Sequence, residues 1–145
     1  MSISNLRPFC FSLAIVAALA QPALFQAAQA QTAPDRRLAP ADEYFGPLKM
    51  SVLGIRNSLR DETARAASYD APDPESAFAH AELIERSVRD WEFKYPHDTW
   101  LPRTLLALSH LYATIDSAQS RRHAAEVAAW LAARYPSSSE AEQVR

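Results

Sequence analysis

Four histidines and several acidic residues are the side chains of this 145-residue chain that could do chemistry, and metal binding is the first chemistry they suggest. His110 and His123 lie on either side of Asp116-Ser117, so two antiparallel helices joined by this turn would hold both imidazoles at one level. Glu126 follows His123 by three residues. A di-iron bundle instead uses Glu-x-x-His pairs and further glutamates that project inward. Because the order is reversed here, we expect solvated or capping histidines, no metal and no cofactor.

Nucleophilic catalysis is the second chemistry to consider. Ser109 and His110 are adjacent on a predicted helix, so they point about 100° apart and neither activates the other. Glu82 and Glu85 share a helix face without a cleft around them, and we expect both to be solvated acids. HExxH, GxSxG and phosphate-loop patterns are absent from the sequence. The sequence therefore predicts a protein that is not an enzyme.

The strongest candidate for recognition is a basic stripe near the start of the first predicted helix. Lys49, Leu53, Arg56 and Arg60 recur at helical spacing, which places them on one face. Three cations around one leucine predict contact with an acidic protein or peptide partner. The alternative is a solvated charged face with a stray leucine, which is the usual meaning of such a stripe.

The remaining residues of this helix and the aromatic residues are expected to pack. The stripe opposite the cations is apolar and should face the core; it consists of Leu48, Val52, Ile55 and Leu59. Gly54 lies in a row of small residues that would let another helix approach closely. Trp100 and Trp130 fall at stripe edges, and Phe93 faces away. An exposed aromatic residue could anchor a peptide, but we expect Trp100 and Trp130 to pack on the adjacent hairpin.

Periodicity predicts an all-α fold of two stacked antiparallel helical hairpins plus a short C-terminal helix. The apolar residues predict helices over 47–67, 74–95 and 101–115, and a fourth that ends at Tyr135. Asp73 is expected to cap the second helix, and Asp98 or Thr99 the third. Capping boxes at Ser137 and Ser139 start the fifth. Trp91-Glu92-Phe93-Lys94-Tyr95-Pro96 is echoed forty residues later at Trp130 to Pro136, and such a period is typical of helical repeats.

The first thirty residues are expected to be a signal peptide, because Arg7 precedes an apolar run that leads to Ala28-Gln29-Ala30. We place the cut after Ala30, with Ala20 as an alternative site and an uncleaved anchor as an alternative fate. Cleavage removes Cys10, the only cysteine, and with it any disulfide or thiolate chemistry. Residues 31–46 are expected to form a flexible tether, in which Tyr44 and Phe45 are packing handles, and residues 47–145 a single helical-repeat domain.

The compartment and the charge limit the partners. A formal net charge of −2 without a basic block argues against nucleic acid. Removing Arg7 leaves the mature chain more acidic, so we expect no general electrostatic attraction to anionic lipid. We also expect no stable membrane insertion after signal cleavage.

The segment from Leu105 to Pro136 resembles a tetratricopeptide repeat. Its residues at the signature positions are Leu105, Leu108, Ser109, Tyr112, Ala124 and Pro136. It departs from the pattern at Ala128, where an aromatic residue is usual, and at Leu131, where a small one is usual. The Tyr-Pro-x-Ser-x-x-Ala form that begins at Tyr135 is similar to repeats of bacterial envelope-assembly and Tol-Pal-associated periplasmic proteins.

Together with the expected signal peptide and the missing catalytic motifs, the resemblance leads us to expect a periplasmic or secreted adaptor or scaffold in the cell envelope that binds a protein or peptide without catalysis. Lys49, Leu53, Arg56 and Arg60 are the expected contact residues. The alternative function is a small helical binding protein that holds an apolar or anionic ligand between hairpins. The sequence leaves the oligomeric state and the identity of the partner open.

Overall fold

The computed structural model describes residues 38–145, which form five α-helices and no strand. The helices are α1 (Val52–Ala66), α2 (Pro74–Lys94), α3 (Leu101–Thr114), α4 (Ala118–Arg134) and α5 (Ser139–Glu142). The all-α fold predicted from periodicity is therefore confirmed. The expected signal peptide (1–30) and the first part of the expected tether (31–37) lie outside the described residues. None of the described helices combines the length and the apolar character needed to cross a membrane.

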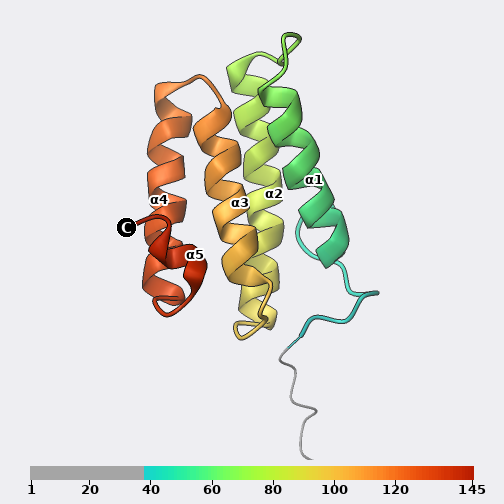
Figure 1. Cartoon of the computed structure of the whole chain (residues 1–145). Coiled ribbons are helices and arrows are strands. Elements are labelled where there is room, and N and C mark those ends of the chain that lie inside the picture. The colour runs from blue at the N-terminus through green and yellow to red at the C-terminus, as the bar shows by residue number, and fades with distance from the viewer. Residues whose placement is uncertain (1–37) are drawn as a thin grey trace, which may run out of the picture. The chain divides into compact units, whose positions relative to one another are not determined.

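Four of the helices run side by side, each antiparallel to the one before it (Figure 1). Helices α1 and α2 form the first hairpin, and α3 and α4 form the second. The central helix is α3, which packs against α1, α2 and α4. The single turn of α5 packs against α3 and α4. This arrangement places α1 next to α3, so the first helices of the two hairpins are neighbours.

The apolar stripes of the sequence form the core. Every residue of the predicted stripe on α3 and its end is buried, namely Leu101, Leu105, Leu108, Tyr112 and Ile115. The stripe on α2 is buried from Ala81 to Trp91, and Tyr95 is buried directly after the helix. Phe78 lies outside that stripe and is also buried, because α2 has neighbours on more than one side. The helical period of 3.6 residues thus predicted which faces of α2 and α3 are buried against the other helices.

The first helix begins at Val52, later than the predicted start at Pro47. Ser51 is its N-cap, and the Ser51 hydroxyl accepts the backbone N–H of Gly54 at 3.2 Å. Residues 46–49 instead form a turn in which Lys49 has a φ of 47°. Leu48 lies on this turn and is 39% exposed, so its predicted place in the core is wrong.

Residues 38–50, which we call the N-terminal segment, pack against α2 and the α2–α3 turn. Phe45 is fully buried, with its ring stacked on Trp91 and edge-on to Tyr95, at a centroid distance of 6.1 Å in each case. The backbone N–H of Gly46 donates to Asp90 Oδ2 at 2.9 Å. The expected tether over 31–46 is therefore wrong from residue 38 onward, because Phe45 completes the core beside Trp91. Tyr44 is the exposed neighbour rather than a second packing residue.

Two of the predicted helix caps also differ. The cap of α5 is Ser138, between the two predicted serines, and its hydroxyl accepts the backbone N–H of Ala141 at 3.1 Å. The cap residue of α3 is Trp100, which has no side-chain cap of its own. The predicted cap of α2 is confirmed, since Asp73 Oδ1 accepts the backbone N–H of Ser76 at 3.0 Å.

Candidate functional site

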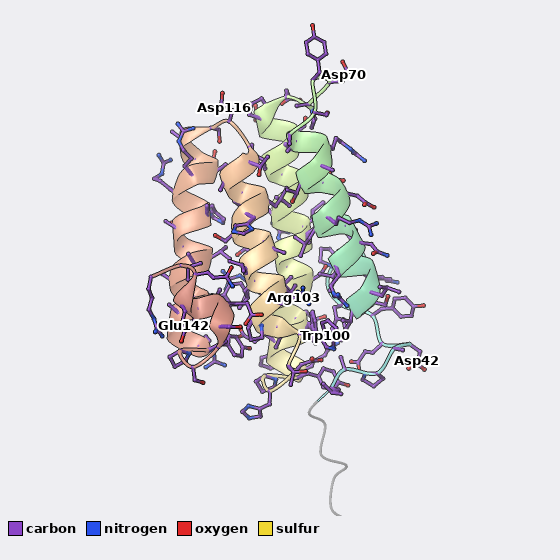
Figure 2. All side chains as sticks on the ribbon, in the orientation of Figure 1. Asp42, Asp70, Trp100, Arg103, Asp116 and Glu142 are labelled. Atoms are coloured by element: carbon purple, nitrogen blue, oxygen red, sulfur yellow. The ribbon has the colours of Figure 1, made fainter. Side chains whose placement is uncertain are left out.

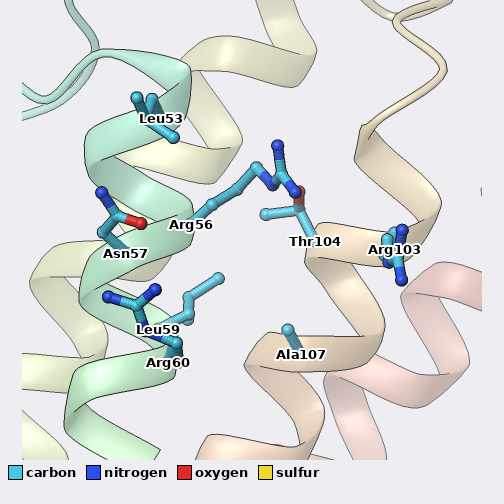
Figure 3. Close-up of a pocket in the computed structure, with 8 residues that line it drawn as sticks. All are labelled: Leu53, Arg56, Asn57, Leu59, Arg60, Arg103, Thr104 and Ala107. Carbon is cyan, nitrogen blue, oxygen red and sulfur yellow. The ribbon is translucent and has the colours of Figure 1, made fainter.

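A groove of about 430 Å³ runs between α1 and α3 (Figure 3). Its residues from α1 are Leu53, Arg56, Asn57, Leu59 and Arg60, and those from α3 are Arg103, Thr104 and Ala107. Three of the four predicted contact residues therefore line one groove. Leu59 is buried and forms its floor, whereas Leu53 is 62% exposed at its edge.

Lys49 does not share a helix face with Leu53, Arg56 and Arg60, contrary to the sequence prediction, and it does not line this groove. Helical spacing places residues on one face only within a helix, and α1 begins at Val52. Lys49 lies on the turn before the helix and has a positive φ, so it does not share the face of Leu53. Arg103 of α3 takes its place as the third guanidinium group of the groove.

The cations of the groove differ in their partners. Arg60 forms an ion pair of 2.9 Å with its neighbour Asp61, and both side chains are exposed, so the pair contributes little to stability. Within residues 38–145, neither Arg56 nor Arg103 is among the arginines that form an ion pair. Two guanidinium groups that have no carboxylate partner among the described residues therefore line the groove from opposite helices.

The side chain of Arg56 reaches from α1 toward Thr104 on α3 (Figure 3). Its guanidinium carbon lies 4.1 Å from the centre of the Trp100 ring. Such a cation–π contact contributes about 0.5–1 kcal/mol at an exposed site, and it holds the guanidinium group across the groove. Trp100 therefore packs on the neighbouring hairpin, as predicted, while 39% of it stays exposed.

The side chains around His123 form a packed, hydrogen-bonded cluster. Glu85 is 6% exposed and accepts hydrogen bonds from Tyr112 Oη at 2.7 Å and Arg89 Nε at 2.8 Å. His123 Nε2 lies 3.3 Å from the same carboxylate. Burial and then the bond to Glu85 raise the pKa of the Tyr112 hydroxyl above its ordinary value near 10. The expectation of a solvated Glu85 and of a solvated or capping His123 is wrong, because three helices meet at this carboxylate.

The other candidate catalytic residues are held apart. The Ser109 hydroxyl is buried and donates to the backbone carbonyl of Ala124 at 3.1 Å, whereas His110 is exposed. Within the described part of the chain, no three His, Cys, Asp or Glu side chains converge as metal ligands would.

A second polar contact joins α2 to α4. Glu92 accepts hydrogen bonds from Trp130 Nε1 at 3.0 Å and Tyr135 Oη at 2.9 Å. The guanidinium carbon of Arg89 lies 4.2 Å from the centre of the Trp130 ring. Trp130 therefore packs on the adjacent hairpin, as predicted. Burial is the main cause that raises the pKa of the Tyr135 hydroxyl above its ordinary value near 10, and the hydrogen bond to Glu92 raises it further.

Sequence reasoning missed Arg103 and Thr104 as groove residues. Both lie at the start of α3, and the period of one helix does not show which residues of a neighbouring helix lie beside it. The signal that could have found them is the repeat itself, because stacked hairpins bring the first helix of one next to the first helix of the other. Candidate contact residues should then be sought on both helices.

The groove is suited to holding a ligand by charge and apolar contact. Arg56 and Arg103 supply hydrogen-bond donors with fixed charge, Asn57 adds a neutral polar group, and Leu53 adds an apolar edge. Comparison with protein-family models, curated proteins and solved structures finds no match to this chain.

Proposed function

We propose that this protein is a non-enzymatic adaptor or scaffold that binds an acidic segment of a partner protein in the groove between α1 and α3. One observation carries the proposal: Arg56 and Arg103 line the same groove from two helices and form no ion pair within residues 38–145. A positive groove attracts an acidic segment and speeds the encounter, and salt weakens this effect.

Each part of the groove has a role in this binding. A guanidinium group can bind a carboxylate through two parallel hydrogen bonds, which fixes the direction of approach as well as adding affinity. Charge alone gives little selectivity among acidic segments. The exposed side chain of Leu53 supplies an apolar contact for a leucine or an aromatic residue of the partner.

The compartment is part of the proposal. The resemblance of residues 105–136 to a tetratricopeptide repeat supports an adaptor in the periplasm or outside the cell, and so does the expected signal peptide. N-terminal sequencing of exported protein tests the compartment, with Gln31 as the expected first residue. A chain that still begins at Met1 would contradict it.

A small anionic ligand is the second candidate. The groove volume of about 430 Å³ lies within the range of small-molecule sites, which is roughly 300–1,000 Å³. A small molecule that co-purifies with the protein and protects the groove from chemical labelling would favour this function over an adaptor.

Site-specific photo-crosslinking in exporting cells tests the proposed function. A photoreactive amino acid replaces Asn57 in the groove or, as a control, exposed Ala125 on α4. We expect an adduct from position 57 only, with mass spectrometry placing the attachment in an acidic segment of one protein. The double variant Arg56→Glu, Arg103→Glu should lose this adduct. An adduct at full yield in the double variant would contradict the proposed function.

A further inference from the structure

The carboxylate of Asp98 joins three separate parts of the molecule next to the groove. Asp98 is 3% exposed and lies in the turn between α2 and α3. Its Oδ2 accepts the backbone N–H of Ala39 at 2.9 Å and Trp91 Nε1 at 3.1 Å. Its Oδ1 accepts the backbone N–H of Trp100 at 3.0 Å. The N-terminal segment, the core of α2 and the start of α3 are thus attached to one charged group.

The last of these contacts leads directly into the groove. The backbone carbonyl of Trp100 accepts a hydrogen bond from Thr104 Oγ1 at 2.8 Å. The Trp100 ring makes the cation–π contact with the guanidinium group of Arg56. Thr104 and Arg56 are groove residues on opposite walls. Figure 2 shows Trp100 and Arg103 at the end of the helices where the N-terminal segment packs. The position of Trp100 therefore influences both walls.

The Asp98 carboxylate holds the start of α3 by accepting the backbone N–H of Trp100 at 3.0 Å. Trp100 is the N-cap residue, and its own side chain makes no capping hydrogen bond. Hydrogen bonds to an ionised acceptor are stronger than those between neutral groups. The direction of the Asp98 carboxylate is set in turn by the two donors on Oδ2, and one of these is the backbone of the N-terminal segment.

We propose that Asp98 is a positioning residue that couples docking of the N-terminal segment to the shape of the groove. When Ala39 donates to Asp98, Trp100 is held where its ring orients Arg56 for a ligand carboxylate. Loss of that hydrogen bond lets Trp100 and Arg56 shift, and the affinity for an acidic segment falls. This inference rests on the proposed function, although the coupling itself can be measured without a ligand.

A proline substitution removes the one hydrogen bond without removing a side chain. Ala39→Pro eliminates the N–H that Asp98 accepts. Ala41→Pro is the matched control, because Ala41 follows Pro40 in a turn closed by the Glu43 N–H to Pro40 carbonyl bond, and proline is favoured at that position. Both variants keep every residue of the groove.

Two readouts follow the coupling. The first is fluorine NMR of protein labelled with fluorotryptophan, in which Trp100→Phe assigns one of three resonances. The second is the affinity for a fluorescein-labelled peptide of repeated Glu-Glu-Leu units. We expect Ala39→Pro to shift the Trp100 resonance and to raise the Kd about tenfold. Ala41→Pro should match the wild-type protein in both.

A double-mutant cycle separates positioning from general destabilisation. If Ala39→Pro weakens peptide binding by displacing Trp100 and Arg56, it should raise the Kd much less in an Arg56→Leu background than in the wild-type background. Equal effects in both backgrounds would overturn the proposal, and so would an unshifted Trp100 resonance. If the wild-type protein does not bind the peptide, the proposed function fails. In that case only the Trp100 resonance tests the coupling. A shift of this resonance in the Ala39→Pro variant supports the coupling, and an unchanged chemical shift overturns it.

Discussion

Tyr95 and Tyr135 end α2 and α4 in nearly the same backbone conformation, with φ of −133° and −129° and ψ of 62° and 52°. The turns that follow also match. Asp98 N donates to the Tyr95 carbonyl and Ser138 N to the Tyr135 carbonyl, both at 3.0 Å. The repeat seen in the sequence is therefore a repeat of backbone geometry, in which each Tyr-Pro pair ends one helix and positions the next.

The two tyrosine hydroxyls also have equivalent partners. Tyr135 donates to Glu92 of the preceding hairpin, and Tyr95 donates to Glu43 of the N-terminal segment. Lys94 adds an ion pair of 3.5 Å to Glu43. The N-terminal segment thus accepts a tyrosine hydrogen bond from the end of the first hairpin, just as the first hairpin accepts one from the end of the second.

Tyr135→Phe tests the contact between the hairpins. The substitution removes the hydroxyl that donates to the Glu92 carboxylate, and we expect a loss of about 1–2 kcal/mol in the free energy of unfolding. Tyr44→Phe is the control, because Tyr44 is 61% exposed and such changes are usually within about 0.5 kcal/mol. Urea titrations measure both. Equal midpoints for the two variants would show that the Tyr135 contact contributes nothing.

Trp91→Ala should be far more damaging than His110→Ala. Trp91 is fully buried between Phe45 and Asp98, and truncation of such a side chain costs about 3–5 kcal/mol. His110 is exposed, so its loss should change stability by less than about 0.5 kcal/mol. Urea unfolding with unchanged m-values compares the variants. A Trp91→Ala protein as stable as His110→Ala would contradict the core described above.

The two glycines should respond to alanine in opposite directions. At Gly54 a Cβ would lie 3.4 Å from Ser51 Oγ and 3.5 Å from Met50 Cβ. Both neighbours directly precede α1 in the chain, so the expected approach of another helix at Gly54 is wrong. Gly54→Ala should therefore stabilise the protein by about 0.5–1 kcal/mol, because alanine favours the helix and restricts the unfolded chain.

Gly46 is the contrasting position. It has a φ of 65°, and a Cβ there would lie 2.5 Å from the backbone Cα of Ser87. Gly46→Ala should lower the thermal midpoint and weaken the docking of the N-terminal segment. Thermal melts of both alanine variants measure the contrast, and a stabilised Gly46→Ala protein would refute the packing of this segment.

Asp73 gives α2 a pH-dependent cap. Hydrogen bonds from the hydroxyl and then the backbone of Ser76 lower the pKa of Asp73 below its ordinary value of 3.8. A lowered pKa in the folded state adds stability that is present above pH 3.8 and is lost as the pH falls through the folded pKa. An asparagine side chain does not titrate, so the stability of the wild-type protein relative to the Asp73→Asn variant should decline in acid. Urea midpoints of both proteins across that range measure it, and a constant difference would contradict the assignment.

The buried faces of α2 and α3 could be predicted from the sequence, because the apolar stripe of a helix recurs every three or four residues and can be identified without knowing the rest of the fold. The sequence did not predict the place of Lys49, because Pro47 and Ser51 are competing start signals and the packing of Phe45 on Trp91 decides between them. Phe45 and Trp91 are far apart in the sequence, so no periodicity links them.

The candidate site was predicted in part for the same reason. Leu53, Arg56 and Arg60 follow from the period of one helix. Arg103 joins them only because α3 packs beside α1, which is a tertiary relationship. The burial of Glu85 likewise depends on Tyr112 and His123 from two other helices.

The measurement that tests the central claim most directly is a titration of the purified protein with the labelled Glu-Glu-Leu peptide, followed by fluorescence anisotropy. We expect binding that weakens as salt rises from about 0.05 to 0.5 M, and weaker binding of a matched Gln-Gln-Leu peptide. The double variant Arg56→Glu, Arg103→Glu should lose binding while it stays folded, with a melting temperature lowered by no more than the loss of the cation–π contact between Arg56 and Trp100 explains. The double variant Arg86→Glu, Arg122→Glu reverses two exposed charges away from the groove and should bind as the wild-type protein does. Equal affinity in all three proteins would contradict the claim that this groove binds acidic segments.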